Sequence, residues 1–140
     1  MKLASLAPLL DVAGIAFVSL QHDVRECDVP VLQGLPNLFR FQTRFGDFSD
    51  TAAAISSLDA VISVDTAVAH LAGALGKPLF LLLPYAADYR WLRERQDSLW
   101  YPTARLYRQP KFGEWDAVVQ TLIGDVKRAA FVVTSRKLSA

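Results

Sequence analysis

The feature that most constrains the fold is the segment from Leu58 to Pro84, which reads LDAVISVDTAVAHLAGALGKPLFLLLP. Two apolar runs with the length of buried strands, at about 60–64 and 78–83, flank a stretch rich in small residues that is typical of a helix. The pattern predicts a strand, a sharp Asp-Thr turn, a helix and a second strand, which together make one βαβ unit. Because both runs lack polar alternation, we expect both strands to be covered on both faces of a parallel sheet.

Polar residues stand where the first of these strands passes into the helix, at Asp65, Thr66 and Ala67. In open parallel sheets, ligands bind outside the carboxyl ends of the strands. The first amides of a helix lack an intrahelical partner there, and the helix dipole adds a partial positive charge. The sequence therefore predicts a phosphate site at this turn, with the hydroxyl and amide of Thr66 as donors. Gly73 and Gly76 stand in no GxGxxG pattern, so we expect them to pack the helix and to end it.

Asp65 and His70 each have two interpretations. As a helix N-cap, the Asp65 carboxylate would accept a hydrogen bond from the amide of Ala67 or Val68. As a site residue, it would orient the turn, since a carboxylate competes in charge with a bound anion. His70 lies four residues after Thr66 on the same helical face, where it either reaches toward a ligand or bonds a backbone carbonyl.

Aromatic and basic residues gather after the second strand, between residues 88 and 102. Loops at strand ends often carry function. An aromatic face there, with Trp91, would stack on a base or sugar, and Arg90 would pair with a phosphate. The alternative is a self-packed surface loop whose arginines cover the aromatic rings. Gln21 and His22, at the end of an earlier expected strand, are further candidate contacts of the same ligand.

The remaining elements alternate between helix and strand. We expect further strands at 15–21, 37–42 and 104–107 and helices at 3–12, 24–32 and 114–131. Phe48, Ser49 and Asp50 are expected to form the staple and N-cap ahead of another helix, rich in alanine, that runs to Leu58. This order predicts an α/β fold, a Rossmann-like three-layer sandwich of about five mostly parallel strands with right-handed crossovers. We expect one domain over residues 1–140, with 132–140 as a frayed tail.

Composition limits the classes of function. A chain of 140 residues that is 52% hydrophobic and 21% charged is one ordinary folded domain. Its net charge of +1 and scattered basic residues argue against a nucleic-acid partner. The lone Cys27 forms no internal disulfide, which fits a reducing compartment. No metal-ligand spacing, catalytic triad or Walker loop is visible, so we expect no metal and no cofactor.

Charged residues also interrupt every long apolar stretch. Asp65, His70 and Lys77 divide the longest one, and Asp11 divides the apolar N-terminus that would otherwise resemble a signal peptide. We therefore expect no membrane span and a cytoplasmic chain.

Two stretches of the sequence, residues 58–84 and DYRWLRERQDSLWYPTARLYRQPKFGEWDAV after them, resemble the carboxyl-terminal lobe of the heptosyltransferase-like glycosyltransferases. The nearest variety is the bacterial one often fused to tetratricopeptide repeats. The resemblance extends from about Leu6 to Val126, and Asp-Thr-Ala-x-x-His-Leu-Ala-Gly-Ala, Arg-Trp-Leu and Trp-Tyr-Pro are its specific motifs. It implies one lobe of a two-lobed GT-B-type enzyme, in which this lobe holds a nucleotide-sugar donor and the other supplies the acceptor site and the general base.

Carried over to this sequence, the resemblance places Asp65, Thr66 and Ala67 at the diphosphate of a nucleoside diphosphate sugar, with His70 supporting them. It requires no metal there. Ala67 stands where relatives often have glycine, which narrows the space for a phosphate.

The resemblance also implies parts that this sequence lacks. No amino-terminal lobe is present, so no catalytic residue is named, and the sequence begins in the helix after the lobe's first strand. Loss of that strand would expose backbone and apolar surface. Three interpretations follow: a truncated chain, a degenerate gene product, or a chain that completes its sheet with a second copy or another protein. The expected function is a donor-binding lobe, inactive in isolation; the alternative is a non-catalytic interaction module that forms a homodimer or binds a partner.

Overall fold

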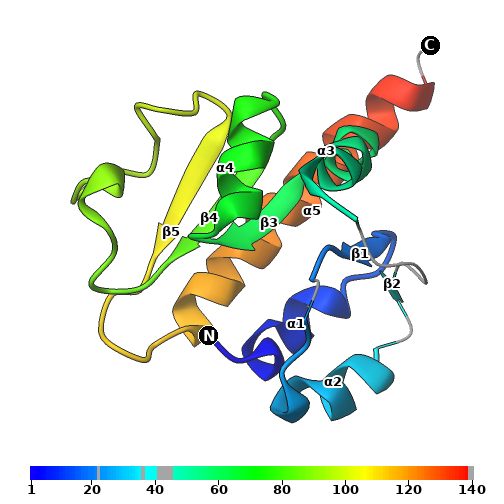
Figure 1. The fold of residues 1–140 in the computed structure, drawn as a ribbon, viewed down its shortest axis with the longest axis horizontal. Helices are drawn as coiled ribbons and strands as arrows, with labels where there is room; N and C mark the ends of the chain where they lie inside the picture. Colours follow the sequence, from blue (N-terminus) through cyan, green and yellow to red (C-terminus); the bar gives the residue numbers. More distant parts are fainter. Residues whose placement is uncertain (22, 36, 41–45, 139–140) are drawn as a thin grey trace. The chain divides into compact units, whose positions relative to one another are not determined.

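A computed structural model of the chain describes residues 1–138 apart from 22, 36 and 41–45. The chain divides into two compact units, which we describe separately. The central unit is Gly46–Glu114, and the terminal unit combines Met1–Phe45 with Trp115–Ala140. The strands in both units pair in parallel (Figure 1), which confirms the parallel α/β class. Among the described residues they lie in two sheets, one of two strands and one of three.

The central unit contains the expected βαβ unit. Its elements are α3 (Phe48–Ser57), β3 (Val61–Val64), α4 (Ala67–Ala74), β4 (Leu79–Leu83), the short 3₁₀ helix η3 (Tyr89–Trp91) and β5 (Ala104–Arg108). The sheet order is β3-β4-β5, so β4 is the middle strand. Val61 lies opposite Leu79, which in turn lies opposite Ala104. This register brings the carboxyl ends of β3 and β4 to the same edge of the sheet.

Burial of β4 explains its unbroken apolar sequence. Its leucines, Leu79, Leu81, Leu82 and Leu83, are all 0–1% exposed. Helix α4 packs on β3 and β4 (Figure 1), and its Ala69 and Ala72 are fully buried. Small side chains on this face let the helix backbone approach the strands closely. The apolar run was therefore a reliable strand signal because both faces of β4 are covered.

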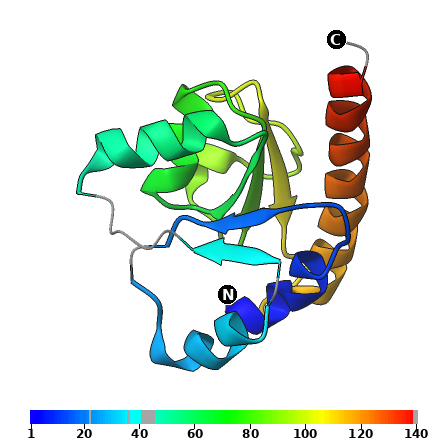
Figure 2. The ribbon, with the colours of Figure 1, turned by 90° about the vertical axis from the view of Figure 1, so that its right-hand side faces the viewer.

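The terminal unit is built from shorter elements. They are η1 (Leu3–Leu6), α1 (Ala7–Leu10), β1 (Phe17–Ser19), η2 (Glu26–Asp28), α2 (Val29–Gln33), β2 (Leu38–Arg40) and α5 (Asp116–Leu138). Figure 2 shows β1 and β2 side by side as a parallel pair. Pro8 and Pro30 each occupy the first turn of a helix, where their missing N–H costs nothing. The strands expected at 15–21 and 37–42 are present but shorter, and residues 41–42 lie outside the described part.

Two expectations about helix ends are wrong. The N-cap of α3 is Asp47, whose extended backbone lets its carboxylate accept hydrogen bonds from the amides of Ser49 and Asp50. Helix α5 continues to Leu138, although a frayed tail was expected from residue 132. No glycine or proline follows Phe131 to end it. Within the described residues, no helix is long and apolar enough to cross a bilayer.

Lys77 connects the start of β4 to the end of α3 within the central unit. Its Nζ donates to the carbonyl oxygens of Ser56 at 2.7 Å and Leu58 at 2.9 Å. A cation at the carboxyl end of a helix is favoured by the helix dipole and by the carbonyls that lack an intrahelical partner.

We predict that Lys77→Met lowers the free energy of unfolding by about 1 kcal/mol, since two charge-assisted hydrogen bonds are lost at a partly exposed position. Lys127→Met is the matched control, because no hydrogen bond or ion pair of Lys127 is seen among the described residues of α5; its effect should stay within about 0.5 kcal/mol. Urea denaturation measures both. Equal effects would show that the two carbonyl contacts contribute no stability.

Candidate functional site

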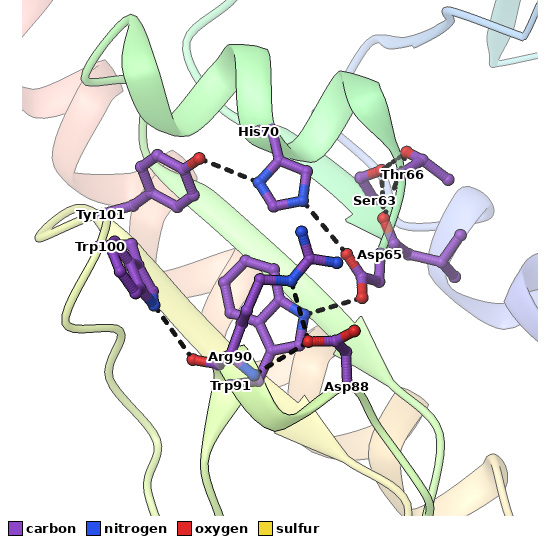
Figure 3. Close-up of polar contacts among 10 residues, drawn as sticks. Ser63, Asp65, Thr66, His70, Asp88, Arg90, Trp91, Trp100 and Tyr101 are labelled. Carbon is purple, nitrogen blue, oxygen red and sulfur yellow. Dashed lines mark hydrogen bonds and ion pairs between the residues drawn. The ribbon is translucent and has the colours of Figure 1, made fainter.

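A polar cluster lies at the carboxyl ends of β3 and β4 in the central unit (Figure 3). Its side chains come from β3, from the turn before α4, from α4 itself and from the long loop between β4 and β5. They are Ser63, Asp65, Thr66, His70, Asp88, Arg90, Trp91, Trp100 and Tyr101. Five of the predicted site residues therefore share one cluster: Asp65, Thr66, His70, Arg90 and Trp91. The parallel register explains why segments distant in sequence meet here.

Asp65 does not cap α4, so the capping prediction is wrong. The N-cap is Thr66, with extended backbone at φ −146° and ψ 170°, and α4 has no side-chain cap hydrogen bond. The Asp65 carboxylate turns instead to the loop after β4. Its Oδ2 accepts a hydrogen bond of 2.8 Å from Trp91 Nε1, and its Oδ1 lies 3.5 Å from His70 Nε2. Asp65 thus orients two aromatic side chains through its two oxygens.

His70 lies between Asp65 and Tyr101. Its Nδ1 is 2.9 Å from the Tyr101 hydroxyl, and its ring stacks on Trp91 with centroids 5.5 Å apart and an interplanar angle of 22°. Because an ionised carboxylate only accepts, a neutral His70 carries its proton on Nε2 toward Asp65 and accepts the Tyr101 O–H at Nδ1. The expected bond to a backbone carbonyl is therefore replaced by a chain of side chains from Asp65 to Tyr101.

Trp91 and Tyr101 hold this series of interacting side chains in place. Trp91 is 1% exposed, so its ring offers no open face for stacking on a base, and its carbonyl accepts a hydrogen bond from Arg108 at 3.2 Å. Tyr101 packs on Gly73 of α4, where an added Cβ would lie 2.4–2.8 Å from three ring atoms. The expected packing role of Gly73 is confirmed, and its partner is the residue that holds His70. Gly76, at φ +67°, follows the carboxyl end of α4 as expected.

The N-terminus of α4 keeps its own donors open. Thr66 Oγ1 lies 3.3 Å from the Val64 carbonyl and 3.1 Å from Ser63 Oγ, so it satisfies no amide of the helix. Among the described residues, the amides of Ala67 and Val68 have no hydrogen-bond partner. Both Thr66 and Ala67 are exposed. Two backbone donors without a partner and one exposed hydroxyl therefore lie at the positive end of a helix dipole, an arrangement that suits an anion.

A cation lies beside these donors. Asp88 Oδ1 accepts from the backbone N of Arg90 at 3.0 Å and from its Nε at 2.9 Å. These bonds hold the pKa of Asp88 below its usual range. The hydrogen bond to Asp88 raises the pKa of Arg90, and the charge of Asp65 acts in the same direction. The Arg90 side chain is 42% exposed, so a permanently charged guanidinium remains accessible to a ligand.

Two further candidate contacts were predicted, Gln21 and His22. Gln21 is an exposed residue of the terminal unit, with its amide 3.4 Å from Ser19 Oγ. His22 lies outside the described residues. Tyr101 was not among the predicted site residues, although it lies in the aromatic stretch 88–102 and in the Trp-Tyr-Pro motif, because no local pattern shows that it reaches α4. Groups of three or more histidine, cysteine or acidic side chains that could hold a metal are absent from the described part of the chain.

Comparison with known proteins finds one matching family model and one similar curated protein. The family model for glycosyltransferase family 9 (heptosyltransferase) matches residues 46–91, the stretch from the start of the central unit to Trp91. The resemblance to heptosyltransferase-like glycosyltransferases is thereby confirmed for this stretch. Protein FlbA of Caulobacter vibrioides is 29% identical over 114 residues, which make up 78% of this chain and 19% of FlbA. The chain thus spans about a fifth of that relative's length. No solved structure matches this chain.

We predict that Gly73→Ala destabilises the central unit by about 1–3 kcal/mol, because the new methyl group overlaps the Tyr101 ring. The sign of the change in stability is informative, because helix propensity alone would make the alanine variant more stable by about 1 kcal/mol. Gly124→Ala in α5 is the matched control: its Cβ would meet only Arg128, at 3.8 Å, so the variant should be as stable as the parent or more stable. Urea denaturation measures both, and stabilisation by Gly73→Ala would contradict the packing described here.

Proposed function

We propose that the central unit binds the diphosphate of a nucleoside diphosphate sugar at the N-terminus of α4. One observation carries the proposal: α4 begins with open amides inside the segment that matches glycosyltransferase family 9. Helix α3 of the same unit provides the contrast. Its first amides are satisfied by Asp47, with bonds of 2.7 Å and 3.2 Å, and offer nothing to a ligand. The Ser49 and Asp50 amides of α3 are therefore occupied, whereas the Ala67 and Val68 amides of α4 remain available to a ligand.

The groups at α4 suit a diphosphate in number and charge. The amides of Ala67 and Val68 donate to one phosphate, and the Thr66 hydroxyl rotates away from the Val64 carbonyl to donate as well. Arg90 supplies the balancing positive charge. Two fixed donors, a helix dipole and a guanidinium need no metal to hold a phosphate. His70 supports the site indirectly by holding Asp65.

We place the reaction in the transfer of a sugar from this donor to an acceptor, with the departing diphosphate stabilised at the same amides. The acceptor site and the general base belong to the amino-terminal lobe that the family resemblance implies. A chain with one cysteine and a nucleotide-sugar ligand fits the cytoplasm.

The purified chain should therefore bind the donor and transfer no sugar. Incubation with nucleoside diphosphate sugars and a panel of sugar or peptide acceptors, followed by mass spectrometry, measures this. Transfer to any acceptor would show that the residues of this chain suffice for catalysis.

Donor binding is measured by amide NMR shifts of the full chain during titration with nucleoside diphosphates and their sugars. We predict shifts centred on Thr66, Ala67 and Val68, with the amides of Ser49 and Asp50 unchanged. Thr66→Val should weaken binding about tenfold, since one hydrogen bond to a charged ligand is lost. Thr121→Val removes a hydroxyl that bonds the Ala117 carbonyl in α5 and should leave the affinity unchanged. Absence of shifts at millimolar ligand in the folded parent would refute the proposal.

A second candidate function is supported by a different observation. Several large apolar side chains of the central unit are exposed: Tyr89 at 83%, Leu99 at 66%, Trp100 at 65% and Phe112 at 90%. Such exposure fits a non-catalytic module that forms a homodimer or binds a protein partner. Sedimentation velocity, combined with the NMR titration, separates the two functions. A tight dimer without nucleotide-induced shifts supports the module, whereas a monomer that binds nucleoside diphosphates supports donor binding.

A further inference from the structure

The loop after β4 contains a strained residue next to the polar cluster. Leu92, which ends η3, has φ 49° and ψ 177°, close to a region of backbone conformation that is essentially confined to glycine. Such a conformation persists only where surrounding contacts impose it. Packing of the Leu92 side chain supplies few of these contacts, since the residue is 44% exposed. The strain is therefore held through the main chain.

Arg108, the last residue of β5, supplies the main-chain contacts. Its Nη2 donates to the carbonyl of Trp91 at 3.2 Å and also to the carbonyl of Leu92. These two peptide groups lie on either side of the Leu92 Cα, so a donor that holds both of them fixes the φ and ψ of Leu92. Arg108 itself pairs in register with Leu83 of β4. The guanidinium group thus ties the strained residue to the sheet.

The environment of Arg108 is unfavourable for a cation. Burial lowers the pKa of this half-buried side chain, and the charge of Arg93 acts in the same direction. None of the ion pairs found among the described residues includes Arg108. Its acceptors are the two backbone carbonyls in place of a carboxylate. A salt bridge therefore does not explain this arginine, whereas its hold on the loop does.

The conformation of Leu92 fixes the residues before it. The Leu92 amide closes the turn of η3 by donating to the Tyr89 carbonyl at 3.1 Å. This turn carries Arg90 and Trp91, whose side chains both lie in the polar cluster (Figure 3). The Trp91 indole donates to Asp65 at 2.8 Å. A change in φ at Leu92 would therefore alter how this turn meets the residues in front of α4.

We propose that Arg108 is a positioning residue that holds Leu92 in its strained conformation and so keeps Arg90 beside α4 for the donor diphosphate. The inference rests on the proposed function for its ligand, whereas the hold on the loop exists in the free protein. Arg108 acts through the main chain and does not touch the diphosphate. Without it, Leu92 relaxes to negative φ in part of the population, and only the remainder binds.

The test combines Arg108→Met with Leu92→Gly. Arg108→Met should weaken binding of the tightest ligand among ADP, GDP, UDP and CDP about fivefold to tenfold, because only part of the population keeps the binding conformation. Glycine adopts the conformation of Leu92 without strain, so in the Leu92→Gly background the same change should weaken binding about twofold or less. Isothermal titration calorimetry measures the parent, both single variants and the double variant. Equal losses in the two backgrounds would overturn the inference, since direct attraction between the Arg108 charge and a phosphate does not depend on residue 92.

Two control variants match these changes. Glu94→Gly places glycine at another residue of the loop with positive φ, at 61°, to which Arg108 makes no hydrogen bond among the described residues. It should not rescue Arg108→Met, and rescue there would overturn the specific role of Leu92. Arg93→Met removes an equal charge from an exposed side chain of the same loop and should change the affinity about twofold or less.

The indole N–H signal of Trp91 in NMR spectra reports on the loop without any ligand. It should shift in Arg108→Met and return toward its parent position when Leu92→Gly is added. Parent protein that binds no nucleoside diphosphate refutes donor binding, while this shift and its return would still support the hold of Arg108 on the loop. An unchanged indole signal in folded Arg108→Met overturns the inference even where the parent binds.

If Arg108→Met does not fold, Leu92→Val decides. The position is 44% exposed, so this variant should fold. A β-branched residue disfavours positive φ more strongly than leucine does, so the affinity should fall about threefold although Arg108 is kept. Parental affinity in Leu92→Val would show that the conformation of residue 92 does not matter for binding, which would overturn the inference.

Discussion

The hydrogen bond from Trp91 to Asp65 is the interaction on which the polar edge of the central unit depends. It connects the turn after β3 to the loop after β4, two segments that adjacent parallel strands bring to the same edge of the sheet. Through Asp65 the bond also determines the orientation of His70, and through His70 it reaches Tyr101. The indole of Trp91 is 1% exposed, so water cannot replace Asp65 as the acceptor of its N–H. The buried hydrogen bond therefore keeps this series of side chains rigid.

Packing against α4 imposes a second constraint on the same edge. Tyr101 reaches His70 because Gly73 leaves room for its ring, and Ala69 and Ala72 let the helix lie close to the strands. Each of these small residues buries less apolar surface than a larger side chain would at the same position of the helix. Glycine inside a helix also costs about 1 kcal/mol relative to alanine. The helix therefore gives up local stability so that an aromatic side chain from another segment can reach its polar end.

The sequence predicted the central unit well and the polar cluster only in part. Expected strands at 60–64, 78–83 and 104–107 are found at Val61–Val64, Leu79–Leu83 and Ala104–Arg108, because continuous apolar runs identify strands covered on both faces. The role assigned to Asp65 as a cap was wrong. Capping rules consider the nearest amides, whereas the carboxylate found a donor 26 residues away. Tyr101 was missed for the same reason, being 31 residues from its partner His70.

The contrast between α3 and α4 bears on which function the chain performs. The N-cap of α3 is Asp47, whose carboxylate caps the helix, whereas the N-cap of α4 is Thr66, which makes no side-chain cap hydrogen bond. An interaction module needs only a stable fold, and for that purpose a capped α4 would be the simpler solution, worth about 1 kcal/mol. Sites where a local rule is broken in favour of a distant contact are commonly functional ones. An uncapped α4 beside a charged Arg90 has an evident use if an anion takes the place of the cap, which favours donor binding over the interaction module.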